Sequence, residues 1–381
     1  MKKVGIICEY NPFHNGHIYH LEKIKEMYPD SMIILVMSSS FTMRGEISIL
    51  NKWDKTEIAL TYGVDLVVEL PTFYSTNSAD TFAFGAVKIL NYLNCDYLVF
   101  GSESNDIELL KGLANTQINN QDYDRKVMEY MNLGNNYPTS MAKALKDICK
   151  KTINLPNDLL GLSYIKQIML LNSKMIPISV KRTNNYHDTA INGEITSATS
   201  IRNSLEIGID ISKTVPKITN DKIIKVYLEK YFELLKYQII TNINNLNVFQ
   251  DVDEGLDNLI AKNIFKVSNY NELIEKIKTK RYTYNRLNRM FIHIFLNIRK
   301  NDTAKLKEIN YIRVLGFSKI GREFMKKRKK EIGVPIITNY SDLDNSNLDF
   351  ELHITYLYNM VTNQNKMNLI ELKSIPIQKE D

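Results

Sequence analysis

The chain has 381 residues, of which 44% are hydrophobic, so it is long enough to form about two domains with buried cores. Its three cysteines, Cys8, Cys95 and Cys149, are widely spaced and form no CxxC pair, which argues against a disulfide framework and a structural zinc site. The apolar stretch near the N-terminus is too short for a signal peptide, and no run approaches the roughly 18 apolar residues of a membrane span. We therefore expect a cytoplasmic protein without membrane association, and nothing in the sequence indicates a protein partner.

The first half of the chain alternates between strand-like and helix-like segments. Short runs rich in β-branched residues are found at 3–10, 31–38, 63–71, 95–102 and 176–182. Amphipathic stretches separate several of them, at 18–27, 51–62 and 80–93. This alternation predicts an α/β fold with a doubly wound, mostly parallel sheet, whose ligands bind beyond the carboxyl ends of the strands. A helical insertion, about 105–171, is expected between the fourth and fifth strands.

The second half is predicted to be mainly helical and basic. After about residue 205 there is no convincing strand until 334–340. The net charge of the whole chain is +6, but residues 279–334 alone contain 16 Lys or Arg and 4 Asp or Glu. Such a region with interleaved Tyr and Phe is typical of a nucleic-acid site, although a solvated helix face has a similar composition. We therefore predict one domain at 1–205 and a second, basic domain at 206–381.

The motif NPFHNGH follows the first predicted strand and combines a turn with the start of a helix. The first N–H groups of a helix are unpaired and form an anion site. His14 and His17 lie on one face of this helix, so both imidazoles can donate to the same phosphate, while Gly16 leaves room for a flat base. The pattern indicates stabilisation of charge on an α-phosphate as pyrophosphate leaves. The alternative is a capped turn with two exposed histidines, and His20 is expected to be ordinary helix surface or to support the site rather than to be a third catalytic group.

A second motif, TSATSIR at 196–202, follows the fifth predicted strand. The two motifs resemble the signatures of the nucleotidylyltransferase superfamily, relatives of the class I aminoacyl-tRNA synthetases that transfer AMP or CMP and release pyrophosphate. The resemblance implies that Ser197, Thr199 and Arg202 bind the leaving β- and γ-phosphates. Hydroxyls that cap a helix and an arginine fork suit that role. The implied catalytic residues are His14, His17 and Arg202.

A longer series of motifs is similar, in the same order, to the family of bacterial tRNA(Met) cytidine acetate ligases: EYNPFHNGH, RGE, KWDKTEIAL, GVDLVVELP, FGSES, LPNDLLGLSYIK, KRTNNYHD, SATSIR and RYTYNRLNRMFIHI. This family activates acetate with ATP as acetyl-adenylate and transfers the acetyl group to N4 of the wobble cytidine of elongator tRNA(Met). The resemblance implies ATP, Mg²⁺, acetate and elongator tRNA(Met) as ligands, with no metal held by the protein alone. The implied ATP contacts are Ile7, Cys8, Glu9, Tyr10, Asn11, Pro12, Phe13, His14, Asn15, Gly16, His17, Ile18, Tyr19, His20, Gly101, Asn157, Arg182, Ser197, Thr199 and Arg202.

The residues are compatible with that chemistry. Acetate is already ionised at neutral pH, so its attack on the α-phosphorus needs positioning and charge neutralisation but no general base. The sequence contains no P-loop and no acetyl-CoA pyrophosphate loop, so ATP is the expected energy source. The segment SSSFTMRGEIS at 38–48 departs from the family pattern, and no role in acetate binding is assigned to it.

For several residues, and for the function itself, the sequence leaves alternative interpretations open. KWD at 52–54 either caps a helix or contacts substrate, and the pair at 187–188 is either functional or a loop hydrogen bond. The Tyr and Arg residues of 282–289 either contact RNA or belong to core and helix surface, and KKRKK at 326–330 either contacts phosphate or is solvated. Two other functions remain open: a small-molecule adenylyltransferase of cofactor biosynthesis, and a non-catalytic RNA-binding protein with a nucleotide fold.

Overall fold

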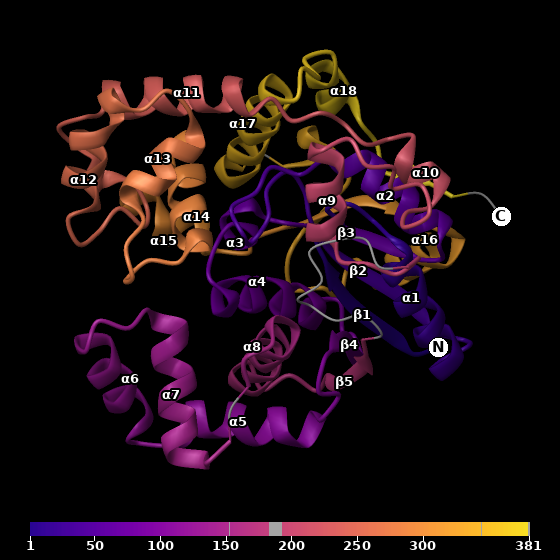
Figure 1. Cartoon of the computed structure of the whole chain (residues 1–381). Helices are drawn as coiled ribbons and strands as arrows, with labels where there is room; N and C mark the ends of the chain where they lie inside the picture. Colours follow the sequence, from indigo (N-terminus) through magenta and orange to yellow (C-terminus); the bar gives the residue numbers. More distant parts are fainter. Residues whose placement is uncertain (152, 183–192, 344, 380–381) are drawn as a thin grey trace.

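The computed structural model describes residues 1–151, 153–182, 193–343 and 345–379, built around an eight-stranded sheet (Figure 1). The strand order is β5-β4-β1-β2-β3-β6-β7, and β8 pairs with β6. Strands β1 to β5 are parallel, whereas β6 is antiparallel to β3, so the predicted doubly wound, mostly parallel sheet is confirmed. The strands are β1 (Lys3–Cys8), β2 (Met32–Ser38), β3 (Leu66–Leu70), β4 (Tyr97–Ser102), β5 (Ile176–Lys181), β6 (Ile312–Phe317), β7 (Ile336–Ile337) and β8 (Ile377–Gln378).

The central strands are mostly apolar because helices cover both faces of the sheet. Successive side chains of a strand point to opposite faces, so Ile34 of β2 packs in one core and Leu35 in the other. Helices α4 (Ala79–Tyr92) and α8 (Pro156–Leu170) are among those that contribute to the first core, and α1 (Asn15–Met27) and α2 (Lys52–Thr61) contribute to the second.

The sheet opens at its topological switch point, between β1 and β4. Strand β1 pairs with β2 along its whole length, from Lys3 to Cys8, but with β4 only at Val4 and Gly5. The connections from β1 and from β4 also leave toward different helices, which is the arrangement that opens a crevice beyond the carboxyl ends of the strands. The fold therefore places a binding site directly above β1.

Helical segments on either side of β5 complete the chain, as expected. The insertion between β4 and β5 consists of α5 (Ile107–Asn119), α6 (Tyr123–Asn132) and α7 (Tyr137–Cys149), followed by α8. Figure 1 shows α5 to α7 as a group separate from α11 to α15. The later helices are α9 (Ala198–Glu206), α10 (Lys217–Asn220), α11 (Leu228–Thr241), α12 (Leu256–Asn263), α13 (Tyr270–Ile277), α14 (Tyr284–Phe295), α15 (Thr303–Leu306), α16 (Lys319–Arg328), α17 (Ser346–Val361) and α18 (Met367–Lys373).

The expectation that no strand precedes residue 334 in the second half is wrong, because β6 joins the main sheet beside β3. Arg313 interrupts the apolar run of β6, yet it is only 1% exposed. Its guanidinium pairs with Glu69 of β3 at 3.1 Å and Glu371 of α18 at 2.9 Å, and Lys52 pairs with the same two carboxylates. Buried charges require such partners. The division at residue 205 stays a prediction.

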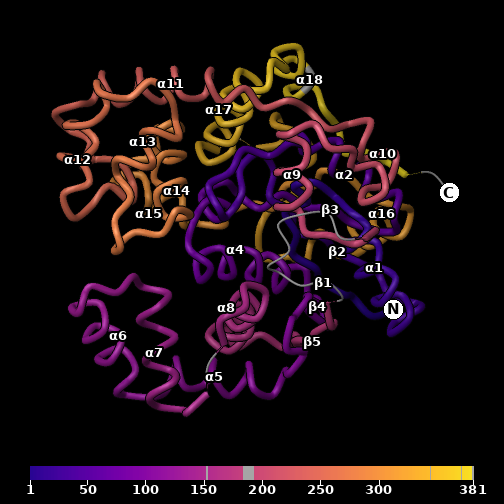
Figure 2. Tube along the Cα trace, viewed as in Figure 1, coloured from indigo at the N-terminus to yellow at the C-terminus, as the bar shows by residue number. Residues whose placement is uncertain are grey.

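The C-terminal segment returns to the sheet after α18. Figure 2 shows this yellow part of the trace running from α18 back past α2, and β8 pairs there with Gly316 and Phe317 of β6. Across the described residues, every helix is too short or too polar to cross a membrane.

Candidate active site

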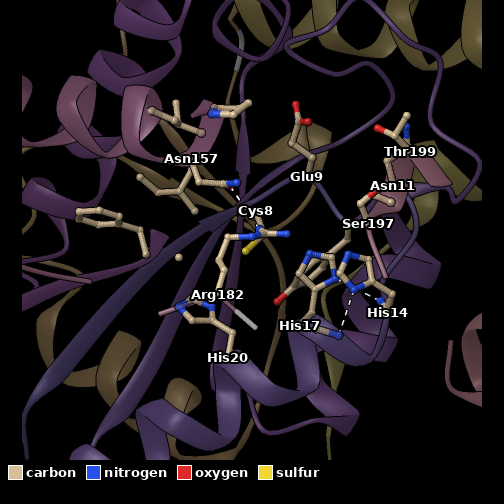
Figure 3. A pocket seen from close by; sticks show the side chains of 18 of the residues that line it. Cys8, Glu9, Asn11, His14, His17, His20, Asn157, Arg182, Ser197 and Thr199 are labelled. Atoms are coloured by element: carbon tan, nitrogen blue, oxygen red, sulfur yellow. Dashed lines mark hydrogen bonds between the residues drawn. The ribbon is translucent and has the colours of Figure 1, made fainter. Parts of the chain in front are cut away.

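A cavity lies beyond the carboxyl ends of β1, β4 and β5, at the switch point (Figure 3). Its walls also include the first turns of α1, α8 and α9 and the segment 39–48, here called the β2 loop. The structure brings together in this cavity most of the residues that the sequence singled out: Ile7, Cys8, Glu9, Tyr10, Asn11, His14, Gly16, His17, Tyr19, His20, Gly101, Asn157, Arg182, Ser197, Thr199 and Arg202.

Four residues of the predicted ATP segment are absent from the cavity lining. Pro12 and Phe13 are buried behind it, and the Phe13 ring stacks on Tyr62 with 5.1 Å between the ring centroids. Asn15 donates its side-chain amide to the backbone carbonyls of Glu194 and Lys213, and Ile18 packs against a core. These four side chains support the segment that carries the site.

The two motif histidines cap the helix that carries them. His14 is the N-cap residue of α1, and its Nδ1 accepts a hydrogen bond from the Gly16 N–H at 3.0 Å. In return, Nδ1 of His17 accepts from the His14 N–H at 3.1 Å, so the pair forms a reciprocal capping box. The two rings lie 3.9 Å apart between centroids. The alternative of two exposed histidines is wrong for His14, which is 5% exposed.

These hydrogen bonds determine which ring nitrogen of each histidine can donate. Burial, then the positive charges of Arg182 and Arg202, lower the pKa of His14 to about 3, so its ring is neutral at pH 7. Burial, then neighbouring His14, lowers the pKa of His17 well below its usual value. A neutral imidazole that accepts at Nδ1 carries its proton at Nε2. Each ring therefore presents one Nε2–H donor.

The ring of His14 packs closely against Gly16. A Cβ atom at residue 16 would lie 2.9 Å from Cε1 and 3.0 Å from Nδ1 of His14. Real Cβ atoms essentially never approach that closely, so a side chain here would displace the capping ring. This packing is a second reason for glycine at residue 16, and the expectation that it also makes room for a flat base stays a prediction.

Buried polar atoms without partners also line the cavity. Among the described residues, Nε2 of His20 and Nδ2 of Asn11 are buried and have no hydrogen-bond partner. Such atoms are costly unless a ligand or water satisfies them, so this donor set fits a polar ligand such as a nucleotide. Across the cavity, Arg182 donates to Oδ1 of Asn157 at 3.4 Å, and its side chain lies against Gly101.

The first turn of α9 and the β2 loop meet at the same cavity. Ser197 caps α9 by accepting from the Ser200 N–H at 3.1 Å, and Thr199 accepts from Arg44 at 3.1 Å. Arg202 donates to the Asn11 carbonyl at 2.6 Å and pairs with Glu46 at 2.6 Å. Met43, Arg44 and Glu46 also line the cavity, although no site role was predicted for them. The RGE motif is the signal that could have revealed the last two.

The β2 loop is held in place by helix α14. The Arg289 guanidinium donates to the Met43 carbonyl at 3.0 Å. Gly45 has a φ of +72°, and a Cβ there would lie 2.4 Å from the Arg289 backbone nitrogen and from the Asn288 carbonyl carbon. Arg289 is thus a structural residue, and Tyr282 is also largely buried, with its hydroxyl donating to Glu254.

The remaining candidates divide between structural roles and exposed surface. The N-cap residue of α2 is Asn51, which accepts from the N–H groups of Trp53 and Asp54. Lys52 and Trp53 contact Glu371, and Asp54 pairs with Lys222, so KWD packs in the first turn of α2 and not in the cavity. The five basic residues 326–330 are all exposed at the end of α16. The pair at 187–188 lies outside the described residues.

A parallel sheet with a switch-point cavity, a histidine-capped helix and converging arginines defines a nucleotide-dependent transferase. The chain belongs to the HIGH Nucleotidyl Transferase family, whose model matches residues 1–371. It is 41% identical over 347 residues, 87% of this chain and 86% of the relative, to the tRNA(Met) cytidine acetate ligase of Caldicellulosiruptor saccharolyticus. The relative of that name from Anoxybacillus flavithermus is 38% identical over 358 residues, 89% of each chain.

Two solved structures match this chain over nearly its whole length. The apo structure of Thermotoga maritima TmcAL has a TM-score of 0.91 to this chain and 30% sequence identity, and the match covers 99% of both chains. A second structure of Thermotoga maritima TmcAL, bound with α-thio ATP, has a TM-score of 0.89 at the same identity and coverage.

Proposed function

We propose that this chain is an ATP-dependent tRNA(Met) cytidine acetate ligase. It activates acetate as acetyl-adenylate, releases pyrophosphate, and transfers the acetyl group to N4 of the wobble cytidine of elongator tRNA(Met), forming N4-acetylcytidine. The observation that carries the proposal is the pair of Nε2–H donors held at the switch point by the α1 cap, in a chain whose relatives are named for this reaction. Because its macromolecular substrate is tRNA, the enzyme acts in the cytoplasm.

The residues of the cavity have separate roles in the first step. His14 and His17 donate to the α-phosphate, and the N-terminus of α1 adds the partial positive charge of its free N–H groups. Arg202, with Ser197 and Thr199, binds the leaving β- and γ-phosphates, and Arg202 exchanges its bond to Glu46 for a phosphate oxygen. The nucleoside of ATP lies on the β4–β5 side of the cavity, beside the Arg182 and Asn157 pair.

Mg²⁺ and acetate are the two remaining ligands of the proposed first step. The described residues contain no group of three or more His, Cys, Asp or Glu side chains that could hold a metal ion. Mg²⁺ is therefore expected to enter with the phosphates of ATP, where it neutralises their charge. The acetate methyl group fits the apolar part of the cavity lining, which includes Phe82, Phe100 and Tyr164.

Nucleoside mass spectrometry tests the whole proposal. Purified protein, ATP, isotopically labelled acetate and unmodified elongator tRNA(Met) should give labelled N4-acetylcytidine, with AMP and pyrophosphate released. A tRNA whose wobble cytidine is replaced by uridine lacks the amine and should receive no label. Acetyl-CoA without ATP and acetate should also give none. An enzyme that adenylates pantetheine phosphate or nicotinamide mononucleotide, and leaves the tRNA unlabelled, would contradict the proposal.

A further inference from the structure

Two carboxylates line the cavity among the described residues, and only one of them is in an ion pair. Glu46 pairs with Arg202 at 2.6 Å. Glu9, the residue after β1, has Oε1 fixed by the Met43 N–H at 2.6 Å, while its second oxygen has no hydrogen bond within the described part of the chain. Glu9 is partly exposed to the cavity, and Figure 3 shows its carboxylate pointing away from His14 and His17.

The strand order places Glu9 on the side where an acceptor can enter. Met43 belongs to the β2 loop, so the contact holds the Glu9 carboxylate toward β2. The proposed nucleoside contacts, Asn157 and Arg182, lie on the opposite side of β1, toward β4 and β5. With ATP extending from the β4–β5 side across the α1 cap, the β2 side is left for the cytosine base.

The second half-reaction, transfer of the acetyl group to cytidine N4, needs a proton acceptor. The first half-reaction, formation of acetyl-adenylate, does not. The cytosine N4 lone pair is conjugated with the ring, so the amine is a weak nucleophile. As N4 attacks the acetyl carbonyl carbon, the C–N bond forms, the bond from that carbon to the AMP oxygen breaks, and AMP leaves with the electron pair. N4 must lose one proton in this process. The Nδ1 atoms of His14 and His17 already accept backbone hydrogen bonds, so these two rings cannot take it.

We propose that Glu9 accepts the proton from the cytidine N4 amine during acetyl transfer, an inference that rests on the proposed function. Glu9 then releases this proton to solvent after the product leaves. Burial raises the pKa of its carboxyl above the ordinary value and Glu46 adds to the rise, while the Met43 N–H, Arg44 and Lys55 oppose it. A carboxylate with a raised pKa is a stronger base than a free one. The titratable or charged groups that face it are Cys8, Arg44, Glu46, Lys55 and Tyr164.

The test separates the two half-reactions in Glu9→Gln. Acetate-dependent ATP–pyrophosphate exchange reports the first, and single-turnover transfer from synthetic acetyl-adenylate to saturating tRNA reports the second. A general base contributes about 10² to 10⁴ in rate, so transfer should fall at least 100-fold more than exchange. Glu46→Gln is the matched control: it removes the paired carboxylate of the same cavity, and it should lower exchange at least as much as transfer, because its partner Arg202 is placed at the β- and γ-phosphates, which acetyl-adenylate lacks. Glu9→Asp should recover part of the transfer rate.

Equal losses of exchange and transfer in Glu9→Gln would overturn the assignment and make Glu9 an ATP-binding residue. A second measurement uses the wild-type enzyme, so it does not depend on the folding of any variant. Its transfer rate from acetyl-adenylate should rise with pH as Glu9 ionises, and a transfer rate that does not rise with pH would also overturn the inference. If wild-type enzyme transfers no acetyl group at all, the proposed function itself fails.

Discussion

His14 and His17 each use one ring nitrogen to hold α1 and keep the other for a ligand. Replacing His17 by asparagine should separate these roles, because an asparagine carbonyl can accept from the His14 N–H but offers no donor at the Nε2 position. We expect exchange in His17→Asn to fall about 100-fold or more, with little change in unfolding free energy. His17→Ala should lose a similar rate and also about 1 kcal/mol of stability, as for a lost cap.

Exchange assays and chemical unfolding of both variants check this prediction. The first control is the melting temperature of His17→Asn, which should remain close to that of the wild-type protein. Near-normal acetate-dependent exchange in either variant would show that His17 has no catalytic part.

The buried neutral histidines should make the protein less stable in mild acid. Burial, followed by the charge of Arg182, lowers the pKa of His20 to about 4, whereas an unfolded histidine titrates near 6.5. Between these values the unfolded chain binds the extra proton, so stability is intact above about pH 6.5 and is lost as the pH falls toward 4. His20→Gln removes this titration. Between pH 7 and pH 5, the unfolding free energy of His20→Gln should therefore fall by up to about 2 kcal/mol less than that of the wild-type protein.

Urea unfolding of both proteins at the two pH values measures the difference. A variant that differs from wild type by the same amount at pH 7 and pH 5 would show that His20 does not titrate in this range.

How far the site could be predicted depends on the sequence distance between its parts. The HxGH donors follow from local spacing, because three residues along a helix place two side chains on one face. Arg44 and Glu46 could not be assigned in this way, because their partners, Thr199 and Arg202, lie 155 and 156 residues further on. The close packing of the His14 ring against Gly16 could not be predicted either, because it depends on the rotamer of His14.

The β2 loop and α14 form one structural unit through Gly45. Alanine there would require a left-handed backbone and would also collide with the backbone of Asn288 and Arg289. Gly208 is a matched control, because its φ is +74° but nothing lies within 4 Å of an added Cβ. Gly208→Ala should cost about 1 kcal/mol and leave exchange unaffected. Gly45→Ala should cost more and lower exchange at least tenfold, since Arg44 and Glu46 shift with the loop.

Thermal unfolding and exchange kinetics of the two alanine variants test the link. Equal destabilisation with equal exchange rates would mean that the contact with α14 does not position the loop.

A strand can be predicted from sequence where its own residues form a continuous apolar run. Strand β2 is a continuous apolar run and is buried at all seven positions, so its sequence alone is sufficient. Strand β6 contains Arg313, whose charge is acceptable only because Glu69 and Glu371 reach it from distant elements. Local composition could not reveal that compensation, and the predicted strand at 334–340 shortens to Ile336–Ile337 for lack of longer pairing.

Across the whole molecule, the basic excess of the second half is only partly available to tRNA. Arg289 and Arg313 are used inside the protein, but the run 326–330 is exposed. Neutralising these five residues with glutamine should weaken tRNA binding and flatten its salt dependence, because each phosphate contact adds roughly 0.9 or less to the logarithmic slope. Acetate-dependent exchange should change less than twofold, since α16 contributes no residue to the cavity lining.

Filter binding across a salt series, run beside the exchange assay, measures both effects. The control neutralises five exposed lysines elsewhere in the first half of the chain, Lys143, Lys146, Lys150, Lys151 and Lys174, with the same change in net charge. If this control weakens tRNA binding as much as the 326–330 variant, the run at the end of α16 is not a specific tRNA contact.

The antiparallel pairing of β3 with β6 has a consequence for synthesis on the ribosome. Asp65, just before β3, accepts a hydrogen bond from Ser318, 253 residues later in the chain. During translation, one edge of β3 stays without its partner strand until nearly the whole polypeptide has emerged, although β1 and β2 are ready much earlier. An open strand edge is a template for pairing with other chains. The nascent nucleotide-binding half therefore depends on its own distant C-terminal segment, or on a chaperone, to stay out of aggregates.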